Sequence, residues 1–228
     1  MSQIKYYIFV FLVLITTNFY PHDNIEDDIS LYKNRIDFFV EEADKETQKS
    51  NYFNAITILQ KALVIAEKIE SEKDQGILYS KIANLQYNLE KYQEANFTII
   101  KAMTIQSRID DTANLAVSRY TCGIIYLAQE DYTNALDYFK SAKTIFEEEN
   151  YNELVAKVTL NEAKAHLGQG NLTEANALVD KAIISSKKYK LPDVQSAALI
   201  KSGEIAYTEG KYERALAQTL EGSNIAKS

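Results

Sequence analysis

Histidine and cysteine, which often bind metals or act in catalysis, are scarce in this sequence. Its 228 residues include two histidines, His22 and His166, and a single cysteine, Cys122. Neither histidine belongs to an H-E-x-x-H motif, and no glycine-rich phosphate loop or G-x-S-x-G element occurs. His166 stands on an expected helix, at a position that favours a packing role over acid–base chemistry. We therefore expect no enzyme activity, no catalytic residue, no cofactor and no metal.

The remaining reactive side chains also have simple structural explanations. Cys122 lies within a helical pattern, where a lone thiol is usually buried as a small apolar residue. The acidic pairs Asp27-Asp28 and Asp110-Asp111 lie near expected helix starts, where carboxylates interact favourably with the helix dipole. Neither pair predicts a metal site.

The overall charge excludes two classes of partner. The chain has a formal net charge of −7 and a sequence pI of about 5.0. Nucleic-acid binding needs a basic stripe, and attachment to anionic lipid needs a basic cluster. We expect neither kind of surface.

The first 20 residues resemble an export signal. Lys5 is their only charged residue, and residues 6–15 form an unbroken apolar run. A run of this length is typical of a secretory signal and short for a membrane span. No A-x-A-like cleavage site precedes Pro21, so an uncleaved signal anchor is the alternative. We expect an exported protein, periplasmic or secreted, that touches a membrane only through residues 1–20 if they stay attached; residues 21–24 form a polar linker.

A ladder of small residues organises the rest of the chain. Alanines recur at intervals of 40 residues, at Ala55, Ala95, Ala135, Ala175 and Ala215. Three residues before them stand Tyr52, Tyr92, Tyr132, Leu172 and Tyr212, and seven residues after them stand Ala62, Ala102, Ala142, Ala182 and Gly222. Self-similarity at a fixed period is the signature of a repeat protein.

Each repeat is expected to contain two helices. Between 25 and 228, apolar residues recur at spacings of three and four, and no stretch alternates with a period of two. This pattern predicts an all-α array of helix–turn–helix units with no sheet. The expected repeats span about 25–70, 73–110, 111–149, 151–189 and 191–228.

The columns resemble the tetratricopeptide repeat. The third unit matches best: residues 122–126 (CGIIY), residues 131–135 (DYTNA), Phe139 and Ala142 follow that family's L-G-x-x-Y…Y-x-x-A…F…A pattern. The usual period is 34 residues, so the 40-residue period here implies longer helices. The resemblance implies an α-solenoid of five repeats in a right-handed superhelix, with the first helix of each unit lining the concave face.

The resemblance also identifies candidate partner-binding positions on that concave face. They share helical spacings of three and four, which place each set on one face of its helix. These positions include Asn84, Tyr87, Val117, Tyr120, Ile124, Leu127, Lys157, Leu160, Lys164 and Tyr207. An apolar and aromatic groove of this kind suits an amphipathic helix or an extended peptide. The alternative is that these side chains pack against neighbouring units.

Two functions follow from the resemblance. The first is a non-enzymatic exported scaffold that binds a protein or peptide on its concave face. The alternative is a periplasmic sensory module of a membrane signalling protein, of the histidine kinase or transcriptional regulator type, because 40-residue variants resemble repeats of bacterial signalling proteins. The last helix carries Leu216 and Leu220 without a following polar cap, which favours either truncation or self-association of this end.

Overall fold

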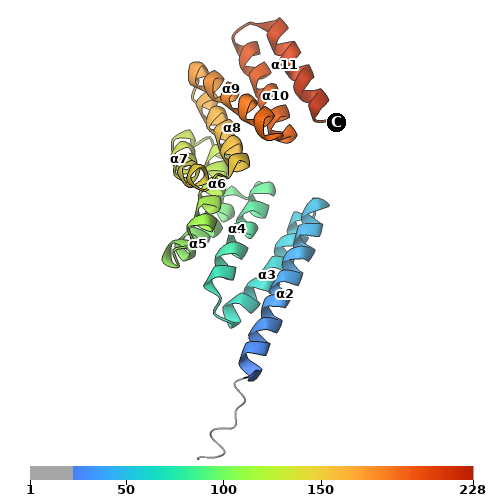
Figure 1. The fold of residues 1–228 in the computed structure, drawn as a ribbon, viewed down its shortest axis with the longest axis vertical. Helices are drawn as coiled ribbons and strands as arrows, with labels where there is room; N and C mark the ends of the chain where they lie inside the picture. Colours follow the sequence, from blue (N-terminus) through green and yellow to red (C-terminus); the bar gives the residue numbers. More distant parts are fainter. Residues whose placement is uncertain (1–22, 228) are drawn as a thin grey trace, which may run out of the picture.

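The computed structural model describes residues 23–227 of the chain, and in that range it contains ten α-helices and no β-strand (Figure 1). The helices are α2 (Asp23–Gln48), α3 (Tyr52–Lys68), α4 (Glu72–Asn88), α5 (Tyr92–Arg108), α6 (Thr112–Ala128), α7 (Tyr132–Glu148), α8 (Asn152–Gly168), α9 (Leu172–Tyr189), α10 (Pro192–Thr208) and α11 (Tyr212–Ile225). The predicted export segment, 1–20, lies outside the described residues. Helix α2 begins at Asp23, inside the segment predicted as a linker. Within 23–227, no helix is long and apolar enough to cross a membrane.

The helices form a solenoid of five pairs. Each helix packs against the next one in the chain, and the first helices α4, α6, α8 and α10 also contact one another in series. Figure 1 shows the pairs in chain order along a curved array, with α2 at one end and α11 at the other. The predicted all-α repeat fold is confirmed.

The same turn closes every helix that is followed by another. One residue in each turn has a left-handed backbone, and these residues recur at intervals of 20: Ser50, Glu70, Glu90, Asp110, Glu130, Asn150, Gly170, Lys190 and Gly210. The turn after α3 illustrates the hydrogen bonding. The Ser71 N–H donates to the Ala66 carbonyl at 2.9 Å, and the Glu70 N–H donates to the Glu67 carbonyl at 3.1 Å. This pattern is a Schellman motif, which satisfies the last carbonyls of a helix.

Two aspartates cap helix starts in equivalent places. Asp111 accepts a hydrogen bond from the Asn114 N–H, and Asp131 accepts one from the Asn134 N–H. Each carboxylate satisfies a backbone donor that the first turn of the helix leaves free.

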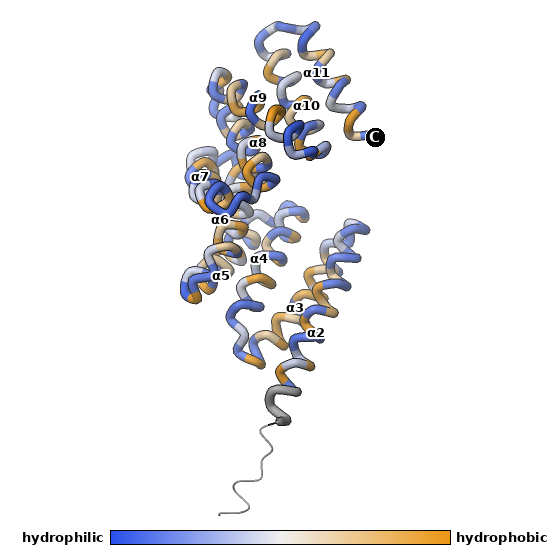
Figure 2. Tube along the Cα trace, in the orientation of Figure 1, coloured by the Kyte–Doolittle hydropathy of each residue, from blue (hydrophilic) through white to orange (hydrophobic). Residues whose placement is uncertain are grey.

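The alanine ladder lies in the core. Every helix mixes hydrophobic and hydrophilic residues along its length, as expected for amphipathic helices (Figure 2). Ala55, Ala95, Ala135 and Ala175 are fully buried, and Ala215 is nearly so.

The second small-residue column lies between three helices. We expected this column to meet the first helix of the next unit, and Ala182 does pack with Val194 and Ala198 of α10. Ala182 also packs with Ala156 of α8, in its own unit. The ladder changes to Gly222 because α11 lies very close to α10 there. A Cβ at Gly222 would lie only 2.8 Å from the Ser196 carbonyl oxygen.

The tyrosine column seals the junction between units. We expected these tyrosines to fill a gap at the turn within a unit. Instead, the Tyr132 ring covers Gly168 at the end of α8, in the following unit: a Cβ at Gly168 would lie 2.3 Å from the ring. Gly168 is therefore required for close packing between units, and α8 extends through it.

Candidate functional site

The first helices of units two to five present a continuous row of side chains, which we call the inner face. It comprises the exposed and half-buried residues that α4, α6, α8 and α10 turn away from the second helices. Of the predicted partner-binding residues, nine lie at least partly exposed on it: Asn84, Tyr87, Val117, Tyr120, Ile124, Leu127, Lys157, Lys164 and Tyr207. The tenth, Leu160, does not.

Leu160 belongs to the core rather than to a binding surface. Only 5% of it is exposed, and it packs with Ala156, Ala182, Val194 and Ala198. The neighbouring helix α10 covers this position, so helical spacing alone misplaced it. The alternative expectation, packing between units, describes this residue.

Tyr120 is held rigidly between two helices. Its ring lies against Phe139 and Phe146 of α7, with centroid distances of 6.0 and 6.4 Å. Burial raises the pKa of its hydroxyl to about 12, and the hydrogen bond from Asn161 opposes this shift. The ring contributes to the core while its hydroxyl reaches the inner face.

A chain of polar groups crosses the inner face from α6 to α8. The Asn161 Nδ2 group donates to the Tyr120 hydroxyl at 2.9 Å. The Lys164 Nζ group donates to the Asn161 Oδ1 atom, also at 2.9 Å. Sequence reasoning missed Asn161, because it lies one position beside the predicted column. A signal was available, since Asn161 and Lys164 are three residues apart and therefore share a helix face.

Lys164 is the central charge of this chain. Its side chain is half-buried, and its ammonium group donates to a neutral amide rather than to a carboxylate. Burial and the neighbouring charge of Lys201 lower its pKa, while Glu204 acts in the opposite direction. Lys201 itself is paired with Glu204, and Lys81 is paired with Asp44 at 2.9 Å. An ammonium group has three donors, so Lys164 retains donors for a ligand.

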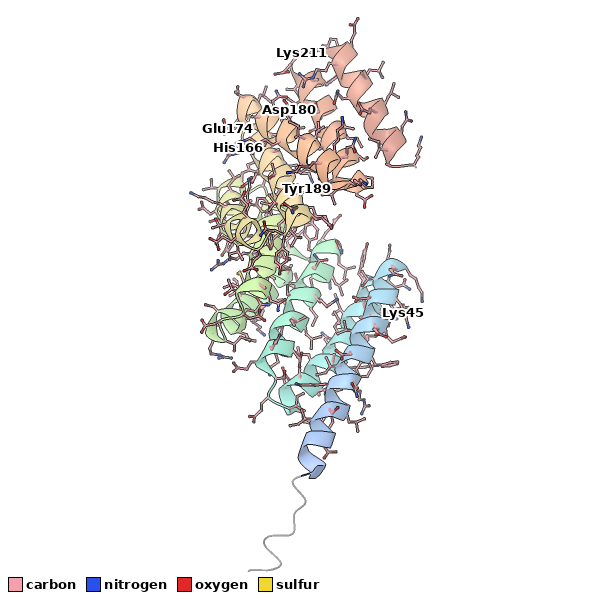
Figure 3. All side chains as sticks on the ribbon, viewed as in Figure 1. Lys45, His166, Glu174, Asp180, Tyr189 and Lys211 are labelled. Atoms are coloured by element: carbon pink, nitrogen blue, oxygen red, sulfur yellow. The ribbon has the colours of Figure 1, made fainter. Side chains whose placement is uncertain are left out.

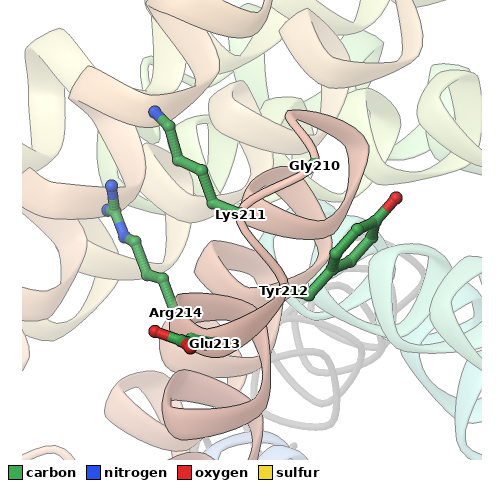
Figure 4. Close-up of a pocket in the computed structure, with 5 residues that line it drawn as sticks. All are labelled: Gly210, Lys211, Tyr212, Glu213 and Arg214. Atoms are coloured by element: carbon green, nitrogen blue, oxygen red, sulfur yellow. The ribbon is translucent and has the colours of Figure 1, made fainter.

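Two other hollows lie at the turns. One, of about 620 Å³, is lined by His166 and residues 170–174; Figure 3 shows His166 and Glu174 in this part of the array. The His166 Nδ1 atom is buried there without a hydrogen-bond partner. The other, of about 430 Å³, is lined by residues 210–214 (Figure 4).

Neither hollow gathers a catalytic set of groups. In residues 23–227, no group of three or more His, Cys, Asp or Glu side chains is arranged to hold a metal ion. Cys122 is buried, which raises the pKa of its thiol to about 12 and keeps it protonated. The inner face is thus the surface with the most distinctive chemistry, and its groups are suited to binding.

The helix pairs can now be assigned to a family. Residues 74–148, which include α5, α6 and α7, match the tetratricopeptide repeat family. The chain carries tetratricopeptide repeats. The recurring helix pairs extend the same architecture on both sides of the matched segment. No curated protein sequence matches the chain.

Solved structures share the tetratricopeptide-like fold. BtubC (BKLC) from P. vanneervenii superimposes with a TM-score of 0.70 at 15% identity, covering 89% of this chain and 91% of that one. A Rap protein complexed with competence and sporulation factor gives 0.76 at 17% identity, covering 85% of this chain and 54% of that one. The Rap conjugation gene regulator of plasmid pLS20, in complex with the Phr* peptide, gives 0.72 at 22% identity, covering 84% and 53%. This chain therefore spans about half the length of the two Rap proteins, and at these identities the likeness concerns the fold.

Proposed function

We propose that this protein is a non-enzymatic scaffold that binds a protein or peptide along its inner face. The observation that carries the proposal is the fixed chain Tyr120–Asn161–Lys164, which spans two repeats and ends in a half-buried charge without a carboxylate on it. Fixed polar groups beside partly exposed apolar side chains are typical of specific binding surfaces. Two similar folds, the Rap proteins, were solved with a factor or peptide bound, which supports a peptide as the ligand class.

The surroundings of Lys164 suggest the chemistry of the partner. A carboxylate placed on Lys164 would form a charge-assisted hydrogen bond in a partly desolvated site, where such bonds are strong. Val117, Ile124 and Leu127 of α6 provide apolar contacts beside it. We infer a partner that presents an acidic group next to apolar side chains.

The test is a selection from a phage-displayed library of random peptides on the immobilised protein. Lys164→Met keeps the length of the side chain and removes its charge, and we expect it to weaken the selected peptides at least tenfold. Lys140→Met, on an exposed lysine of α7, is the matched control and should leave binding unchanged. Equal binding to both variants, each with native circular dichroism, would place the ligand elsewhere and refute the proposal.

We also propose that the scaffold acts after export. The support is the apolar segment 1–20, which has the composition of a secretory signal. A periplasmic sensory role in a membrane signalling protein stays the alternative. Fractionation of expressing cells tests export, and recovery of the protein only from the cytosol would contradict it.

A further inference from the structure

The junctions between units follow one pairing scheme. In each, the second helix of one unit packs antiparallel to the first helix of the next. Lys143 of α7 pairs with Glu162 of α8 at 2.7 Å, and Asn176 of α9 donates to Glu209 after α10 at 3.1 Å. Shifting these pairs by whole repeats predicts which residues would meet if α2 of a second copy followed α11.

The C-terminal end of the array has a groove without a helix in it. The groove lies between α10 and α11, has a volume of about 480 Å³ and is lined by Ile200, Tyr207, Tyr212, Leu216 and Thr219 among others. Leu216 is 63% exposed. Tyr212 projects away from Lys211 and Arg214, the charged residues of its turn (Figure 4). We call this surface the tail face.

The tail face departs from the internal pattern in a specific way. The column occupied by Thr219 holds Leu59, Ile99, Phe139 and Val179 in the earlier second helices, and all four are buried. The next column towards the C-terminus holds Ser223 where α3 and α5 carry Leu63 and Met103. The tail face is therefore polar at two positions that are usually apolar.

The opposite end of the array departs in a complementary way. On α2, Phe38 occupies a column that is buried in the later first helices as Leu78, Ser118, Val158 and Ala198, yet Phe38 is 56% exposed. Beside it, Glu42 and Lys45 form an ion pair at 2.7 Å. Lys45 stands in the column that holds Leu85, Ile125, Ala165 and Ile205 further along. We call this surface the head face.

We propose that the head face of one copy docks on the tail face of a second copy, which continues the solenoid from molecule to molecule. The Lys143–Glu162 pair places Ser223 opposite Glu42 of the second copy. Leu59 and Leu85 share one core cluster, which places Thr219 opposite Lys45. The two polar columns of the tail face thus meet the two polar residues of the head face.

The apolar positions also match. Ala66 and Leu78 share a core cluster, so the equivalent Ala226 lies opposite Phe38 of the second copy. The Asn176–Glu209 bond places Leu216 opposite Lys49, whose aliphatic stem can cover it. Both ends therefore deviate from the repeat pattern at matching positions, which favours a second copy over an unrelated helix.

The test is the molar mass of the full chain measured across a concentration series by sedimentation velocity. We expect the mass to rise with concentration, and expect Phe38→Glu and Leu216→Glu each to remain monomeric. An equimolar mixture of the two variants retains one intact head and one intact tail, so it should form a dimer and nothing larger. Phe53→Glu is the matched control, because Phe53 is 72% exposed on α3, away from both faces, and should associate like the native chain.

Three results would overturn the proposal. They are a native chain that stays monomeric, a Phe38→Glu variant that still dimerises through two tail faces, and a mixture that remains monomeric although both variants keep native circular dichroism. One further variant should strengthen association. The Lys81–Asp44 pair predicts that Glu41 of the second copy approaches Glu204, so Glu41→Lys should tighten association by roughly threefold.

Discussion

Glutamate occupies several positions at which its backbone is left-handed. Glu70, Glu90 and Glu130 have φ between 53° and 61° in otherwise identical turns, whereas Gly170 and Gly210 fill equivalent places. A left-handed backbone costs an ordinary residue roughly 1 kcal/mol because its Cβ approaches the following carbonyl, and glycine avoids this cost.

We therefore expect Glu90→Gly to stabilise the fold by about 0.5–1 kcal/mol, measured by chemical denaturation. The matched control is Gln93→Gly, three residues later inside α5, where the same new residue should destabilise by about 1 kcal/mol. A loss of stability in both variants would contradict the role assigned to these turns.

The sequence revealed these residues only in part. The breaks at 50–51, 90–91 and 130–131 were visible, but nothing in their composition indicates a left-handed residue, because glutamate does not favour that conformation. Similarly, helical spacing grouped Leu160 with the inner face and omitted Asn161. The difference between them depends on how far α10 covers α8, which is a property of the packing.

Helix pairs are held together by places where one backbone lies close to another side chain. A Cβ at Gly123 of α6 would lie 2.6 Å from the Phe139 ring of α7 and 3.2 Å from the Ala135 carbonyl oxygen. A Cβ at Gly76 of α4 would meet the flexible side chain of Gln106 at 3.0 Å.

This difference predicts unequal effects of one substitution. Gly123→Ala should destabilise the protein by about 1–3 kcal/mol, because the buried ring has no room to move. Gly76→Ala should be close to neutral, since Gln106 can shift and alanine favours the helix. Denaturation curves of the two variants decide the matter, and equal losses would show that the approach at Gly123 is not specific.

Elements were the most predictable level of this structure. The 40-residue ladder predicted the helix pairs, and the 3.6-residue stripes placed their buried faces. The contacts of the tyrosine column were not predictable in the same way. Tyr132 covers Gly168 of the following unit, and this depends on the angle between units rather than on the pattern within one.

As a whole molecule, the array is a chain of nearest-neighbour contacts. Each helix touches its neighbours in sequence, and the first helices also touch one another along the inner face. A surface that runs along several repeats can therefore recognise an elongated partner, while the two ends remain available for other contacts. Binding along the inner face and association through the ends are separate properties, and each has its own variants.

The central claim is that a partner binds on the inner face, and hydrogen exchange tests it most directly. The protein would be compared with and without the tightest peptide from the phage selection. We predict slower exchange in α6 and α8, centred on residues 120–164, and unchanged exchange in the outward faces of α3, α5 and α7. Protection confined to those second helices, with α6 and α8 unchanged, would contradict the account.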